Sequence, residues 1–233
     1  MGFNARAGEM TGHTNEAGSG PAAAVTRLLL GFGVLAGPFY LAVSLIQAVL
    51  RDGFDLRRHA LSLLANGPGG WVQTANFCLT GLMVIAAAVG FRRVLGPKAR
   101  AVSLFLGGFG ASMIVAAVFP ADPVDGFPVG TPAGYPASIS TPGLLHFVAG
   151  GLGFTFLAIS CFLAGRAMSR RHSPLLTRFS FFSGLAVVLG FFGGPALPTM
   201  SAVVLGIWFA VLAGWAWLAI MSCHFCRLTP DPK

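Results

Sequence analysis

Long stretches without any charged residue constrain the fold of this chain more than any other feature. The longest covers residues 179–226, which contain no Asp, Glu, Lys or Arg. A transmembrane helix needs roughly 20 mostly apolar residues to cross the hydrocarbon core of a bilayer. Over the whole sequence 9% of residues are charged, whereas a soluble domain carries about 25%. The sequence therefore predicts an all-α, polytopic membrane protein.

Six transmembrane helices in one bundle are expected within residues 28–221. The uncharged stretch 179–226 is too long for one crossing, and its Gly- and Pro-rich segment 193–199 divides it into two helices. The predicted spans are residues 28–50, 71–91, 101–119, 143–165, 175–193 and 201–221. A flexible cytoplasmic tail, residues 1–27, is expected before this domain, and a short cytoplasmic tail, residues 222–233, after it.

The distribution of basic residues predicts that both termini lie in the cytoplasm. In that orientation twelve of the fifteen Lys and Arg residues fall in cytoplasmic segments, and only Arg51, Arg57 and Arg58 fall outside. Cytoplasmic segments of membrane proteins carry such an excess of basic residues. The net charge of +8 then follows from topology and from attraction to anionic lipid of the inner leaflet. We therefore expect a plasma-membrane protein in contact with the lipid bilayer and without a nucleic-acid partner.

Two long segments are expected on the extracytoplasmic side, residues 51–70 and 120–142. In the first, Asp55–Asn66 has the pattern of a short amphipathic helix at the membrane interface. The second contains two aspartates, Asp122 and Asp125, and no basic residue. Because positive charge is disfavoured on this side of the membrane, the absence of bases from this loop needs no binding site to explain it.

The fourth span is expected to begin with Thr141 as N-cap and Pro142 at the first helical position. His146 then lies in about the first turn of the span, at the interface. Ionisable residues at that depth are functional candidates, although many such histidines only bond to a neighbouring group.

Polar side chains at helical spacing mark the first two spans near their extracytoplasmic ends. They are Ser44, Gln47 and Arg51 in the first span, and Gln73, Asn76 and Thr80 in the second. Amides exposed to lipid are costly, so both stripes are expected to face protein, each other or a water-filled cavity.

Together these features predict a polar pocket that opens to the extracytoplasmic side. Its candidate residues are Arg58, His59, Ser62, Asp122, Asp125 and His146, with Gln47 and Asn76 behind them. The alternative is a network of Arg–Asp and His–Asp contacts that only fixes two loops to the bundle, since ion-pair networks also cluster ionisable residues.

Three segments resemble a known family. RRHALSLLANGPGGWVQTANFCLTGL, FPAD and TPGLLHFVAGGLGF are similar to the bacterial membrane proteins grouped as domain of unknown function 998, over roughly residues 28–221. The resemblance implies a six-span bundle and brings no established reaction or cofactor. Relatives often carry an acidic residue directly after the serine of the first segment, where this chain has Leu63.

Three classes of function remain open from the sequence. The first is binding of a small polar ligand, an ion or a lipid headgroup at the extracytoplasmic pocket. The second is a membrane-embedded, metal-assisted hydrolase acting on lipid, for which His59, Asp122 and His146 are weak candidate metal ligands. The third is an accessory subunit whose glycine-rich spans pack against another membrane protein.

Overall fold

The structure, a computed structural model, describes residues 20–194 and 199–229 of the chain. The long helices in these ranges are α1 (Pro21–Leu50), α2 (Gly70–Leu95), α3 (Arg100–Val118), α4 (Thr141–Arg170), α5 (Pro174–Phe192) and α6 (Met200–Leu228). Each is long and apolar enough to cross a membrane, α3 together with the short 3-10 helix η2 (Pro97–Ala99) before it. The predicted all-α fold with six membrane spans is confirmed.

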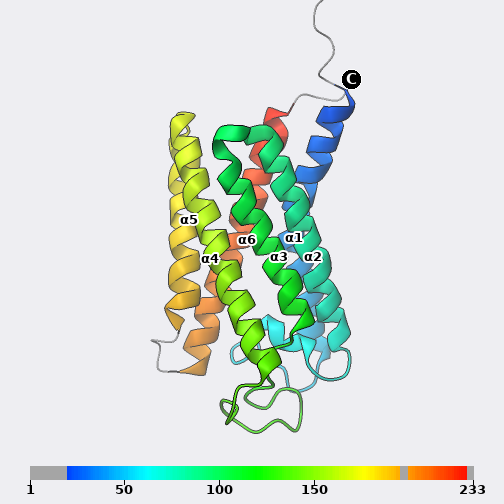
Figure 1. The fold of residues 1–233 in the computed structure, drawn as a ribbon. Coiled ribbons are helices and arrows are strands. Elements are labelled where there is room, and N and C mark those ends of the chain that lie inside the picture. Colours follow the sequence, from blue (N-terminus) through cyan, green and yellow to red (C-terminus); the bar gives the residue numbers. More distant parts are fainter. Residues whose placement is uncertain (1–19, 195–198, 230–233) are drawn as a thin grey trace, which may run out of the picture.

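The six helices form a closed ring. Each helix packs mainly against the helices that precede and follow it, and α6 returns to pack against α1. The start of α1 and the end of α6 lie at one end of the bundle (Figure 1). The first loop (residues 51–69) and the second loop (residues 119–140) lie at the opposite end, called the loop end below.

Several helices are longer than the spans expected from hydropathy, mostly at the end away from the loops. α2 continues to Leu95 and α6 to Leu228, because Lys and Arg side chains can follow a helix past the hydrocarbon and place their charges in water. α1 already begins at Pro21, inside the expected tail. The rest of that tail up to residue 19, the last four residues of the chain and residues 195–198 of the predicted break lie outside the described residues.

Aromatic side chains fill the inside of the ring. The Tyr40 ring contacts those of Phe77 and Trp215, and Trp215 also contacts Phe109, so this cluster joins α1, α2, α3 and α6. Large apolar side chains such as Leu205 are exposed on the outside of the helices. In a membrane this outer surface faces lipid.

Glycines allow two helix pairs to approach closely. A Cβ built on Gly81 of α2 would lie 2.6 Å from the carbonyl oxygen of Gly110 on α3, and the reciprocal distance is also 2.6 Å. Gly190 of α5 and Gly206 of α6 face each other in the same way, at 2.5 and 2.6 Å. Small residues at such contacts let backbones pack without intervening side chains.

The first loop differs from its prediction. Only the second half of the expected helix over Asp55–Asn66 is helical: residues 55–59 form a single turn, and a short 3-10 helix, η1 (Leu61–Ala65), follows. The Asp55 carbonyl accepts from the backbone N–H groups of both Arg58 and His59, at 3.0 and 2.8 Å, and the chain is then extended at Ala60. Contacts of His59 with the second loop hold this shape in place of a helix.

The second loop contains a tight turn at Val124–Phe127. Val124 and Phe127 form an antiparallel bridge, and Asp125 and Gly126 have φ values of 51° and 91°. Asp-Gly is a preferred pair for such a turn, because both central residues need positive φ. The loop ends at Ser140, which caps α4 by accepting from the Gly143 N–H; the expected cap at Thr141 is thus displaced by one residue.

Candidate binding site at the loop end

Arg58, His59 and Asp125 connect the two loops, and this group is called the clasp below. Arg58 Nε donates to Asp125 Oδ2 at 2.8 Å, and Arg58 Nη2 lies 2.8 Å from Oδ1. His59 is 1% exposed. Its Nδ1 accepts from the Asp55 backbone N–H at 2.9 Å, so the ring proton lies on Nε2, which donates to the Asp125 carbonyl oxygen at 3.0 Å.

The clasp fixes the charges of its members. Hydrogen bonds from Arg58 and from the Gly134 backbone N–H lower the pKa of Asp125 from 3.8 to about 2. The same pairing raises the pKa of Arg58. In the first loop, the backbone N–H of Arg57 lowers the pKa of the Asp55 carboxyl. Both carboxylates and the guanidinium are therefore charged at neutral pH.

Apolar and cation–π contacts support the clasp. The Phe127 ring packs edge-on against Phe54 with centroids 5.0 Å apart, and His59 lies 5.6 Å from the same ring. Arg51, at the end of α1, places its guanidinium carbon 5.3 Å from the Phe127 centroid and donates to the Leu64 and Asn66 carbonyls. The two loops thus form one packed cap over the loop end.

Asp122 and His146 do not belong to the clasp. They connect the region where α3 ends with the start of α4. Asp122 accepts from the Ser140 backbone N–H at 3.0 Å and from the Ser140 hydroxyl, so it supports the residue that caps α4. His146 is 8% exposed, and its Nδ1 lies 2.8 Å from the Phe119 carbonyl and 3.2 Å from that of Ala116. Because both partners are carbonyls, Nδ1 carries the proton.

Gln47 and Asn76 belong to a buried hydrogen-bond network between α1 and α2. Gln47 Nε2 donates to Gln73 Oε1 at 2.8 Å, and Asn76 Nδ2 donates to the Ser44 hydroxyl and the Tyr40 carbonyl, each at 3.1 Å. The two polar stripes therefore face each other. Ser62, the remaining candidate, lies half-buried on η1.

The candidate metal ligands do not converge. Within residues 20–194 and 199–229, no group of three or more His, Cys, Asp or Glu side chains could hold a metal ion. His59 instead bonds to the Asp125 carbonyl, His146 bonds to the Phe119 carbonyl at the start of the second loop, and Asp122 bonds to Ser140. The structure therefore does not bring His59, Asp122 and His146 together as one ligand set.

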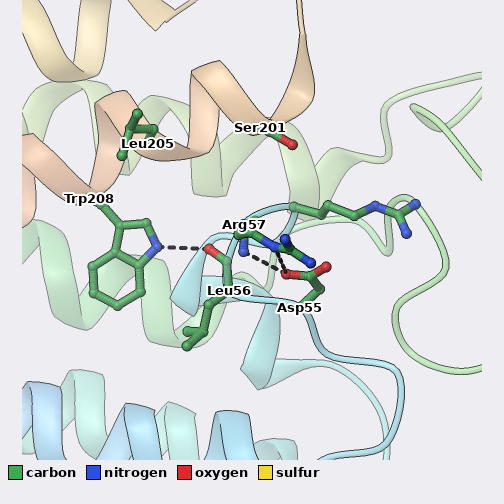
Figure 2. Close-up of a pocket in the computed structure, with 7 residues that line it drawn as sticks. Asp55, Leu56, Arg57, Ser201, Leu205 and Trp208 are labelled. Atoms are coloured by element: carbon green, nitrogen blue, oxygen red, sulfur yellow. Dashed lines mark hydrogen bonds and ion pairs between the residues drawn. The ribbon is translucent and has the colours of Figure 1, made fainter.

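A cavity of about 380 Å³ lies beside the clasp, between the first loop and α6. Figure 2 shows it with Ser201, Leu205 and Trp208 on α6 and Asp55, Leu56 and Arg57 on the loop. Arg58 also lines it, so the cavity and the clasp share this residue. Trp208 Nε1 donates to the Leu56 carbonyl at 3.0 Å and fixes the loop to α6.

Sequence reasoning identified only Arg58 among the residues that line this cavity. Trp208 carried a usable signal, since Trp is enriched where a transmembrane helix meets the membrane surface. The other five, Asp55, Leu56, Arg57, Ser201 and Leu205, carried none, because the contact joins parts of the chain that are 152 residues apart.

Six membrane-competent helices in the described residues, closed into a ring and capped at one end by two joined loops, define a multi-pass integral membrane protein. A model of the family described as "Protein of unknown function (DUF998)" matches residues 34–224. The chain belongs to this family. The search of curated proteins and the search of solved structures each gave no match.

Proposed function

We propose that this protein binds a phospholipid of the extracytoplasmic leaflet, with the headgroup in the cavity between the first loop and α6. The observation that carries the proposal is the composition of the cavity wall, which has the charged residues Asp55, Arg57 and Arg58 on the loop side and, beside the Ser201 hydroxyl, the large side chains of Leu205 and Trp208 on the helix side. A phospholipid has the same division, with a charged headgroup and apolar chains. The volume of about 380 Å³ falls in the usual range of ligand sites, about 300–1,000 Å³.

The loop supplies the polar half. Arg57 has an 87% exposed side chain, so its guanidinium is available to a ligand. Arginine binds phosphate oxygens through two parallel N–H donors, which makes it a favourable partner for a lipid phosphate. Ser201 lies on the opposite side of the cavity (Figure 2) and offers a hydroxyl donor.

α6 supplies the apolar half and a path for acyl chains. Ser201 and Trp208 are seven residues apart, so the cavity extends about 10 Å along the helix axis. From Leu205 an exposed apolar stripe continues through Phe209 and Leu212, at the spacing of one helix face. Acyl chains of a lipid held by its headgroup would follow this stripe into the bilayer.

The clasp positions the loop that forms the cavity. Because Asp125 holds Arg58 and His59, it fixes the turn that includes Asp55 and Arg57. In this proposal His59 and Asp125, together with Ser62, Asp122, His146, Gln47 and Asn76, have positioning roles, and Arg58 both belongs to the clasp and lines the cavity.

The proposed setting is the plasma membrane of a bacterium, with both termini in the cytoplasm. The supporting observation is the excess of Lys and Arg in the segments at the end of the bundle away from the loops. The cavity then opens to the extracytoplasmic leaflet, and the lipid site lies on the side where the chain carries fewest basic residues.

Native mass spectrometry of the detergent-purified protein tests the proposal. The wild type is expected to retain one phospholipid per chain after mild delipidation. Ser201→Trp fills the cavity and should weaken retention by about tenfold or more, equivalent to about 1.4 kcal/mol. Ala111→Trp is the matched control, since Ala111 is exposed on α3, a helix that does not line the cavity. Equal retention by both variants would contradict the proposal.

A further inference from the structure

We infer that the cavity selects a zwitterionic amino-phospholipid, one whose headgroup carries both a phosphate and a primary ammonium group. This inference rests on the proposed function and specifies the lipid class. It follows from the charges that line the cavity, which are of both signs and lie close together.

The ionised groups of the site balance each other. Arg58 is bound through two donors by Asp125, so its positive charge is already matched. The remaining charges are those of Asp55 and Arg57, whose side chains are joined only by a long contact of 3.5 Å between Arg57 Nε and Asp55 Oδ1. An anionic lipid would bring its negative charge beside Asp55 without a positive group to match that carboxylate. A zwitterionic headgroup supplies a group of opposite charge for both Asp55 and Arg57.

Each end of such a headgroup has a partner. The phosphate would bind the exposed guanidinium of Arg57 and the Ser201 hydroxyl, whereas the ammonium would bind Asp55. The Asp55 side chain is 34% exposed. Its Oδ1 accepts from the Arg57 backbone N–H at 2.8 Å, which orients the carboxylate.

Trp208 adds a second partner for the ammonium. Its indole lines the cavity, and the bond from Nε1 to the Leu56 carbonyl holds the ring in place. Ammonium groups are attracted to the faces of aromatic rings, most strongly to that of Trp. Figure 2 shows the indole on the α6 side of the cavity and Asp55 on the loop side.

The experiment measures binding of two lipids with identical acyl chains, dioleoyl-phosphatidylethanolamine and dioleoyl-phosphatidylglycerol, by native mass spectrometry of the full chain. The wild type is expected to favour the ethanolamine lipid. Asp55→Asn should lower that preference by about tenfold, because it removes one charge-assisted interaction. The asparagine keeps Oδ1 as acceptor for the Arg57 N–H, so the turn is retained.

Several outcomes separate this inference from the proposed function. If both lipids bind in the cavity and the glycerol lipid is favoured by the wild type, the inference is overturned and the proposed function stands. If the wild type and Ser201→Trp bind both lipids equally well, the proposed function fails as well. Soluble O-phosphoethanolamine is expected to compete weakly with the lipid because it lacks acyl chains. If it displaces the lipid at equal concentration, the ligand of the cavity is a free phosphoethanolamine group and not a lipid.

Discussion

At the scale of single residues, Asp125 connects the two loops through both its side chain and its backbone carbonyl. Its carboxylate binds Arg58 and the Gly134 N–H, and its carbonyl accepts from His59. It also occupies a turn position with positive φ, which Asp and Asn tolerate better than most residues. Asn is therefore the substitution that removes the charge and retains the turn.

Asp125→Asn is expected to lower the Tm of the detergent-solubilised protein by about 3 °C at pH 7. The pKa of Asp125 is lowered in the fold, to about 2. Its contribution to stability is thus fully present above pH 4 and is lost as the pH falls through about 2. Thermal unfolding followed by circular dichroism between pH 2 and 7 should show the two proteins converging at the acid end. A difference in Tm that stays constant between pH 2 and 7 would show that the Asp125 charge does not contribute to stability.

At the scale of the elements, glycine pairs determine how closely neighbouring helices approach. The contact between Gly81 and Gly110 leaves no room for a Cβ on either residue. By contrast, a Cβ on Gly151 of α4 would have no heavy atom within 4 Å. The same residue type therefore has different roles on two helices of one bundle.

Gly81→Ala should separate α2 from α3 and lower the free energy of unfolding by about 1–3 kcal/mol, the usual cost of overpacking. Gly151→Ala is the matched control and should have little effect or a slightly stabilising one, since Ala favours helix. Thermal denaturation of both variants in the same detergent measures the difference. Equal loss of stability in the two variants would show that helix contact at Gly81 is not the cause.

Hydropathy predicted the number and class of the helices because a bilayer requires long apolar segments. The helical spacing of polar residues identified the two polar stripes, because buried amides must find hydrogen-bond partners. In the structure these amides bond to each other across α1 and α2. Local pattern failed at residues 55–59, where contacts of His59 with the second loop replace a helix. It also could not predict that the first loop meets α6, because Leu56 and Trp208 are brought together only by closure of the ring.

At the scale of the whole molecule, the ring places the start of α1 and the end of α6 at one end of the bundle and the cavity at the other. Membrane topology then decides which leaflet the cavity faces. Two exposed positions at opposite ends of the bundle, Tyr135 in the second loop and Lys98 in η2, are suited to cysteine labelling.

In a variant without the four native cysteines, Tyr135→Cys should react with a membrane-impermeant maleimide in intact cells. Lys98→Cys should react only after the membrane is permeabilised, because cytoplasmic segments carry the basic residues. The extent of labelling is measured from the increase in mass of the protein. The reverse pattern would place the cavity on the cytoplasmic side and contradict the proposed orientation.

The most direct test of the lipid-binding account is an experimental structure of the protein in phosphatidylethanolamine nanodiscs, with a bound antibody fragment as a size marker. We expect headgroup density between Arg57 and Ser201, with phosphate oxygens at about 2.7–2.9 Å from the guanidinium nitrogens, and an acyl chain along Leu205 and Phe209. A cavity that contains only water, or that closes by packing of Ser201 and Leu205 against the first loop, would contradict it.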